Sequence, residues 1–182
     1  KDNQPSIGVR PIHKEQLIKA MWRGTNTIPS WSWQGCEGMK TVVEVYTAAP
    51  KVALYVNDKL IGEQEVKDYV ASFEDVTYEP GTLKAVATDA NGKQYEQTLT
   101  SATGKLGISI EPEKNSYKCG ELAFININLV GENGIVESKA ERTLTVTVEG
   151  GELLGYGSQQ LITEAAFKDG VYPTYYGQSQ AV

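Results

Sequence analysis

The sequence predicts an all-β protein made of two tandem immunoglobulin-like antiparallel β-sandwiches. Short runs rich in β-branched and aromatic residues recur from about residue 28 onward, and turn signals separate them at roughly 8 to 12 residues, as in sandwich domains. Helical periodicity is almost absent. Within the runs, apolar and polar residues alternate, which is typical of strands with one buried face. We therefore expect strands packed in two layers in each unit.

Two strand runs open the first unit. They are "TVVEVYT" (41–47) and "KVALYVN" (51–57), and the second places Val52, Leu54 and Val56 on one face. Turn signals follow at Asn57–Asp58, Pro80–Gly81 and Asn91–Gly92. Asparagine, aspartate and glycine tolerate the positive φ angles of tight turns. The pattern predicts a sequence of hairpins.

The strand pattern restarts after "SATG" (101–104), which predicts a second unit over residues 104–182. Its expected strands lie within "LGISIEP" (106–112), "ELAFININLV" (121–130) and "RTLTVTVE" (142–149), with a turn at Asn133–Gly134. This unit is shorter than the roughly 100 residues of an immunoglobulin-like sandwich. We therefore expect it to be incomplete at its C-terminus, with one or two closing strands beyond Val182.

Two segments leave alternatives open. "HKEQLIKAMW" (13–22) carries Leu17, Ala20 and Met21 at helical spacing, but it is short enough to be irregular instead. The closing "GQSQAV" (177–182) is expected to be either a strand lacking its neighbour or a frayed tail. An open sheet edge there would invite pairing with another copy of the chain.

Composition and charge exclude several classes of partner. The chain has 182 residues, of which 40% are hydrophobic and 22% charged, as in ordinary globular proteins. Its net charge of −6, from 17 basic and 23 acidic residues, offers no clustered basic surface for nucleic acid. No apolar run approaches the roughly 20 residues of a membrane helix. We expect neither nucleic acid nor membrane as a partner.

The residues that usually carry nucleophilic or metal chemistry are scarce. His13 is the only histidine, and it lies beside Lys14 and Glu15 without a context that would orient it. Cys36 and Cys119 fall in different predicted units. We therefore expect no catalytic triad, no zinc site, no disulfide framework and no cofactor.

Acidic residues are the candidates for glycoside chemistry, because a glycosidase needs two carboxyl groups across the scissile bond. The acidic residues considered are Glu37, Glu44, Glu63, Glu65, Glu74 and Asp75. All of them lie in turns or in alternating strands, where a solvated outer face accounts for them. The sequence therefore predicts no catalytic residue.

Aromatic residues are the candidates for carbohydrate contact. Trp31 and Trp33, in "IPSWSWQGCEG" (28–38), would face the same side of a strand. That side is predicted to be the core, and a sugar-stacking platform is the alternative. Tyr172, Tyr175 and Tyr176 gather in "GVYPTYYGQ" (170–178) and have the same two interpretations.

Five motifs carry a resemblance to a known family. They are "TNTIPSWSWQGCEGM", "VEVYTAAPKVALYVNDKLIG", "YEPGTLKAVATDANGK", "GGELLGYGSQ" and "AAFKDGVYPTYYGQSQAV". In this order they resemble the C-terminal accessory region of glycoside hydrolase family 2, the group that contains bacterial β-galactosidases. The resemblance implies a connector from a catalytic TIM barrel (1–27), an accessory sandwich (28–103) and a bacterial immunoglobulin-like domain (104–182).

The resemblance also implies what the chain does. The family's acid/base and nucleophile glutamates lie in the barrel, so no catalytic residue is carried over to this chain, and the chain alone is not an enzyme. The parent would hydrolyse a terminal β-galactoside with retention, through a covalent intermediate. The two sandwiches would brace the barrel of the same chain, shape one rim of its entrance, and mediate self-association.

Two other functions remain as alternatives. The chain could be a carbohydrate-binding module that uses the aromatic residues above. It could instead be a cell-surface adhesive pair of immunoglobulin-like domains, although no fixed-period repeat or anchor motif supports this. The sequence does not fix the compartment of the parent.

Overall fold

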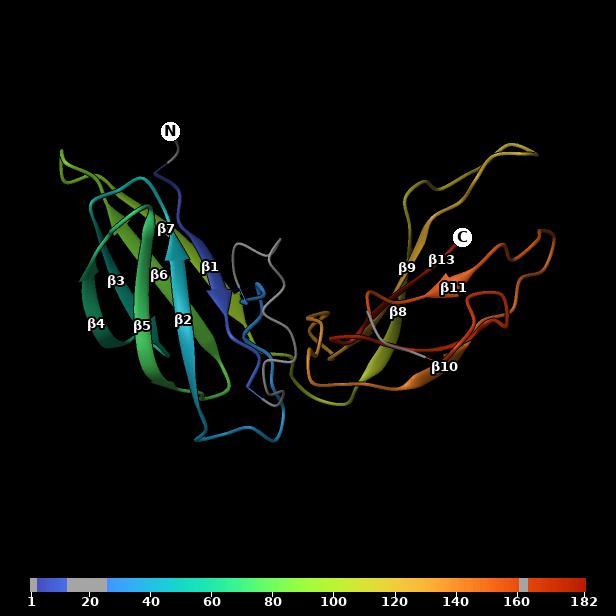
Figure 1. Cartoon of the computed structure of the whole chain (residues 1–182), viewed down its shortest axis with the longest axis horizontal. Helices are drawn as coiled ribbons and strands as arrows, with labels where there is room; N and C mark the ends of the chain where they lie inside the picture. Colours follow the sequence, from blue (N-terminus) through green and yellow to red (C-terminus); the bar gives the residue numbers. More distant parts are fainter. Residues whose placement is uncertain (1–2, 13–25, 161–163) are drawn as a thin grey trace. The chain divides into compact units, whose positions relative to one another are not determined.

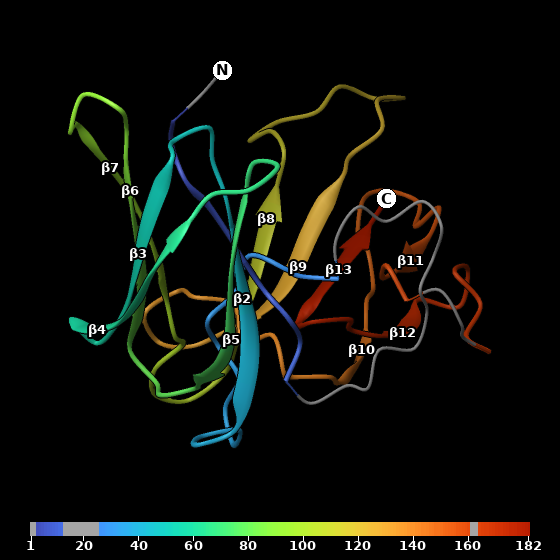
Figure 2. The ribbon, with the colours of Figure 1, turned by 60° about the vertical axis from the view of Figure 1, so that its left-hand side comes forward.

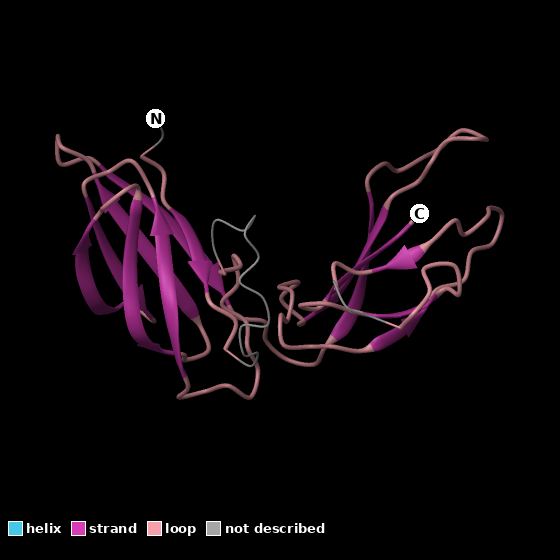
Figure 3. Ribbon diagram, in the orientation of Figure 1, coloured by secondary structure: helices cyan, strands magenta, loops and turns pink. Residues whose placement is uncertain are grey.

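The computed structural model describes residues 3–12, 26–160 and 164–182, and it divides into two compact units (Figure 1). The first unit spans Lys1–Ser101 and the second Ala102–Val182. Every regular element in the described part of the chain is a strand (Figure 3). The segment 13–22 and His13 lie outside the described residues.

The first unit is a sandwich of two antiparallel sheets (Figure 2). Its strands are β1 (Ser6–Val9), β2 (Lys40–Tyr46), β3 (Lys51–Val56), β4 (Lys59–Glu65), β5 (Val70–Thr77), β6 (Thr82–Thr88) and β7 (Gln94–Thr100). One sheet has the order β1-β2-β5 and the other β4-β3-β6-β7. This arrangement and the second unit below confirm the predicted all-β sandwich class.

The alternating residues of this unit form its core, as predicted. Val52, Leu54 and Val56 of β3 are all buried, and β6 contributes Leu83 and Ala85 from the next strand. Asn57 and Asp58 join β3 to β4 with φ angles of 48° and 62°. The left-handed pair gives the tight hairpin that the sequence predicted.

The segment around Trp31 and Trp33 differs from the prediction. Residues 31–33 form no strand, yet Trp31, Ser32 and Trp33 are all fully buried. A strand would have pointed Ser32 away from the core, whereas this loop buries all three side chains. The predicted core packing of both tryptophans is confirmed, and the strand is a wrong prediction.

A network of buried polar groups holds this loop in the core. The Tyr78 hydroxyl accepts a hydrogen bond from the Trp33 amide at 3.0 Å, and its ring meets Trp31 edge-on at 5.0 Å between centroids. Ser101 donates its hydroxyl proton to the Trp31 carbonyl. The Trp31 indole N–H donates to the Glu79 carbonyl at 3.0 Å. A buried loop of this kind needs such partners for its backbone groups.

The second unit has a four-stranded and a two-stranded sheet. Its strands are β8 (Gly107–Pro112), β9 (Ile125–Val130), β10 (Thr143–Thr145), β11 (Tyr156–Gly157), β12 (Val171–Pro173) and β13 (Gln178–Ala181). The sheets have the orders β11-β13-β9-β8 and β10-β12. The predicted strand 142–149 is longer than β10, because its residues 146–149 lie outside the observed strand.

The closing segment is neither an unpaired strand nor a frayed tail. β13 lies inside the four-stranded sheet, where it pairs with β11 on one side and β9 on the other. Its Gln178 and Gln180 face out, while Ser179 and Ala181 are buried. The strand alternative is therefore confirmed, and the prediction that it lacks a neighbour is wrong.

The core of the second unit centres on two tyrosines. Tyr156 and Tyr172 pack edge to face, 6.4 Å between ring centroids, beside Ile127 and Ala181. Ser179 donates its hydroxyl proton to the Ile127 carbonyl at 3.0 Å, so the Tyr156 hydroxyl donates to Ser179 Oγ, also at 3.0 Å. The Tyr172 hydroxyl is buried and has no hydrogen-bond partner among the described residues.

The burial of Trp33 predicts a large loss of stability when the side chain is truncated. Trp33→Ala should lower the free energy of unfolding by about 3–5 kcal/mol, because it removes a fully buried indole and leaves a cavity. Denaturant unfolding of the chain measures this loss. Tyr69→Ala is the matched control, since Tyr69 is 54% exposed and should change stability by less than about 0.5 kcal/mol. Equal effects of the two substitutions would contradict the packing role.

The two tyrosines of the second core should respond differently to loss of the hydroxyl group. Tyr156→Phe should destabilise the unit by about 1 kcal/mol, because a buried hydrogen bond is lost. Tyr172→Phe should be neutral or stabilising, because its buried hydroxyl lacks a described partner. Both substitutions keep the aromatic contact. Denaturant unfolding distinguishes them, and a larger loss for Tyr172→Phe would be the opposite of this expectation.

Burial also predicts a loss of stability at alkaline pH. Desolvation by burial raises the pKa of Tyr156 above its ordinary 10.0. The folded state therefore keeps this proton after the unfolded chain has lost it. The contribution is complete below pH 10 and declines as the pH rises from 10 through the folded pKa. Unfolding curves from pH 8 to 11 should show a steeper decline for the wild type than for Tyr156→Phe, and parallel declines would refute the assignment.

Candidate functional site

The aromatic residues proposed for carbohydrate contact fall into two groups. Trp31, Trp33 and Tyr172 are each 0% exposed, so none of them offers a ring face to a sugar. Stacking on a sugar requires a solvent-facing ring. For these three residues the carbohydrate alternative is therefore corrected to core packing.

Tyr175 and Tyr176 lie together in the turn between β12 and β13, and both are half-buried. Their ring centroids are 4.4 Å apart, but the rings are inclined by 56°, so they do not form one flat platform. The Tyr175 amide donates to the Gln178 carbonyl and Tyr176 has a φ of 51°, which closes the turn. A sugar contact at these two tyrosines remains a prediction.

Five of the six carboxylates considered for glycoside chemistry contact a nearby group. Glu37 accepts a hydrogen bond from the Gly35 amide at 2.9 Å, and Glu74 accepts one from Ser72 at 3.1 Å. The other contacts are Lys51 with Glu63, Lys40 with Asp75 and Tyr46 with Glu44. Glu37, Glu63, Glu65, Glu74 and Asp75 are exposed, and Glu44 is half-buried. These positions are those of solvated strand faces and turns.

Sequence reasoning did not single out the buried carboxylate of Glu137, which is 2% exposed. Its Oε1 accepts the Lys139 amide at 3.0 Å, and its backbone carbonyl accepts the Ala140 amide. These are contacts within one turn, where the carboxylate satisfies backbone donors. Tyr78 and Ser101 were missed as well, since no local pattern links them to the tryptophan loop.

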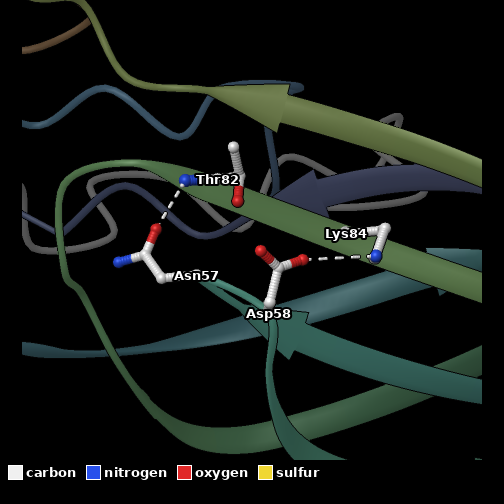
Figure 4. Close-up of polar contacts among 4 residues, drawn as sticks. All are labelled: Asn57, Asp58, Thr82 and Lys84. Atoms are coloured by element: carbon white, nitrogen blue, oxygen red, sulfur yellow. Dashed lines mark hydrogen bonds and ion pairs between the residues drawn. The ribbon is translucent and has the colours of Figure 1, made fainter.

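A surface cluster of polar side chains fixes the β3–β4 hairpin against the start of β6 (Figure 4). Asn57 Oδ1 accepts the Thr82 amide at 2.8 Å, and Asn57 Nδ2 donates to the Pro80 carbonyl at 3.1 Å. A Cβ at Gly81, whose φ is 130°, would lie 2.0 Å from Asn57 Oδ1, so this position requires glycine.

The same cluster contains one exposed ion pair. Lys84 Nζ lies 3.4 Å from Asp58 Oδ1 and 5.3 Å from the centre of the Tyr55 ring. The Asp58 side chain is 88% exposed, so the pair contributes little to stability. The cluster therefore orders a hairpin, and its amine and carboxylate neutralise each other at the surface.

Metal and membrane sites receive no support from the described residues. No group of three or more histidine, cysteine, aspartate or glutamate side chains gathers there in a way that could hold a metal ion. Cys36 is buried and Cys119 exposed, and both are free thiols. The described part of the chain contains no helix with the length and apolar character needed to cross a membrane.

Comparisons with known proteins place this architecture. Residues 38–96 match the family model described as domain of unknown function DUF4982. The chain is 25% identical over 173 residues to the β-galactosidase BoGH2A of Bacteroides ovatus, covering 91% of this chain and 20% of that protein. It is 28% identical over 149 residues to a β-glucuronidase of Formosa agariphila, and this match covers 73% of this chain and 14% of that protein. The chain thus spans a fifth or less of the curated relatives it matches.

One solved structure is also similar to this chain. A glycosyl hydrolase family 2 member from Bacteroides cellulosilyticus superposes with a TM-score of 0.82 and 25% identity, over 98% of this chain and 25% of that one. The fold and the sequence likeness to these proteins agree with the motifs identified in the sequence. Over most of its length the chain is therefore similar to a part of glycoside hydrolase family 2 enzymes, as the motifs in its sequence predicted.

Proposed function

We propose that this chain is the non-catalytic accessory part of a longer family 2 glycosidase, in which its two sandwiches brace the catalytic barrel and shape one rim of the substrate entrance. The observation that carries the proposal is how the chain uses its polar groups. Three of its buried polar side chains form hydrogen bonds with the protein's own backbone; they are those of Tyr78, Ser101 and Glu137. That use builds a stiff scaffold.

The surface carboxylates support the same proposal. Retaining hydrolysis needs two carboxyl groups about 5–5.5 Å apart, one of them a nucleophile and the other an acid with a raised pKa. The candidate acids here are engaged in short-range pairs such as Lys51 with Glu63, or in turns such as Glu37 with Gly35. The two reacting carboxylates are therefore assigned to a catalytic barrel elsewhere in the parent.

The proposed substrate of the parent is a terminal β-galactoside. The support is the likeness to BoGH2A, whose match covers 91% of this chain. The relative from Formosa agariphila is a β-glucuronidase, so a β-glucuronide is the substrate to compare. In this proposal residues of the barrel recognise the sugar. The two sandwich domains then do not determine which sugar is bound.

Hydrolysis assays on two proteins test the proposal. The longer protein should hydrolyse p-nitrophenyl β-galactoside faster than p-nitrophenyl β-glucuronide. Residues 1–182 alone should release p-nitrophenol from neither substrate. Turnover by residues 1–182 would refute the non-catalytic role. A longer protein without activity on any β-glycoside would refute the assigned reaction.

The bracing role is tested within the longer protein. Trp33→Ala should lower the temperature at which activity is lost, because it loosens the core of the first sandwich, while the activity measured below that temperature stays unchanged. Tyr69→Ala, at an exposed position, is the control. Identical inactivation temperatures for the two variants would show that the sandwich does not support the barrel.

A further inference from the structure

The two units share most of one strand arrangement, but the second adds β11 beside β13 and lacks the counterparts of two strands of the first. In the first unit β1, β2 and β5 form one layer, and β3 lies in the other layer between β4 and β6. In the second unit β8, β9 and β13 are neighbours in the same order, and β12 is the one described strand that pairs with β10. β10 and β12 thus take the places of β3 and β4, and no described strand takes the places of β6 and β7.

The consequence is visible at equivalent positions of β1 and β8. Ile7 and Val9 of β1 lie opposite Val45 and Val43 of β2, and they are 1% and 0% exposed. At the matching register, Ile108 and Ile110 of β8 lie opposite Leu129 and Ile127 of β9.

Ile108 and Ile110 are 58% and 66% exposed, although Leu129 and Ile127 beside them are buried. Directly opposed residues of an antiparallel pair point to the same face. The two isoleucines therefore point to the core side of their sheet, where nothing described covers them.

The strand that covers β1 in the first unit is β7. The two strands lie against each other, and the Gln97 side chain of β7 accepts a hydrogen bond from the Ile7 amide. β7 in turn is hydrogen-bonded to β6, and β6 to β3. The apolar face of β1 is thus covered because β6 pairs with β3 and β7 pairs with β6.

In the second unit one edge of β10 could pair with a further strand in the same way. β12 lies against β11, so the unpaired edge of β10 is the one directed toward β9 and β8 (Figure 2). Leu144 of β10 is only half-buried, as expected for a strand next to an uncovered part of the core.

We infer that two further strands of the parent chain, which follow β13, complete this sheet: the first pairs with the open edge of β10, and the second covers Ile108 and Ile110. Order along the chain identifies the occupant, because β6 and β7 directly follow β5, the counterpart of β13. In the first unit the equivalent stretch runs from Thr77 to Thr100, a difference of 23 residue numbers. The inference rests on the proposed function in one respect, the existence of a longer chain.

A second copy of the chain is the rival occupant. A stable dimer buries roughly 800 Å² on each partner, and the two isoleucines provide only a small part of that. Intramolecular strand addition needs no such area, because the added strand is tethered next to its site. The closing strands of the same chain are therefore the better match.

Cysteine labelling tests the inference in the longer protein. With Cys119→Ser removing the exposed thiol, Ile110→Cys is labelled with a maleimide in the longer protein and in the same protein ending at Val182. Labelling should be slower by about tenfold or more when the chain continues past Val182. Leu60→Cys, at a 50% exposed position in the first unit, should be labelled equally in both.

Three results would overturn the inference. They are rapid labelling of Ile110→Cys in both proteins, slow labelling in both proteins, and protection of the truncated protein that increases with its concentration. The second result would assign the cover to a preceding domain and the third to a second copy.

Hydrogen exchange of the unsubstituted proteins provides a measurement that does not depend on the cysteine variant. Amides of residues 107–112 and 143–145 should exchange more slowly when the chain continues past Val182. This outcome is independent of the hydrolysis assays: a longer protein that is protected but inactive would sustain the inference and refute the proposed function.

Discussion

The first unit depends on the burial of a loop that has no regular secondary structure. The stretch through Trp31 and Trp33 supplies the two largest buried side chains of the core, but its peptide groups cannot join a sheet ladder. Tyr78 and Ser101 take the place of that ladder, one accepting the Trp33 amide and the other donating to the Trp31 carbonyl. Because each unpaired buried peptide group would cost about 1–3 kcal/mol, these two hydroxyl groups remove a substantial penalty from the burial of the tryptophan loop.

The second unit uses the same pair of residue types between two paired strands, since Ile127 lies in β9 and Ser179 in β13. Tyr156 donates to Ser179, which donates to the Ile127 carbonyl, and an edge-to-face aromatic contact with Tyr172 lies alongside. The Tyr78 hydroxyl also lies 3.4 Å from Ser101 Oγ, so in each unit a serine hydroxyl links a tyrosine to a backbone carbonyl inside the core. The pairs fix the position of one segment relative to another, which a purely apolar contact does less specifically.

Strands with strong alternation could be predicted from the sequence, and contacts between distant segments could not. β2 and β3 were predicted almost to the residue, because one face of each is apolar and buried throughout. For β13 the sequence predicted a strand as one of two alternatives but not its two neighbours, because pairing partners are set by the tertiary fold. The tryptophan loop was predicted as a strand because its two-residue spacing is also that of a strand. Tyr78 and Ser101 went unnoticed, since their partners are set by the tertiary fold, 45 and 70 positions away.

The low identity to the relatives fits a scaffold better than a recognition site. The chain is 25% and 28% identical to two enzymes whose names specify different sugars. A sandwich core tolerates many sequences as long as burial and hydrogen bonding are satisfied, whereas a sugar site requires particular groups at particular positions. A region that set the sugar would be expected to be more similar to one of these relatives than to the other, so the similar likeness to both agrees with the proposed role, in which these domains stabilise an enzyme and do not select its sugar.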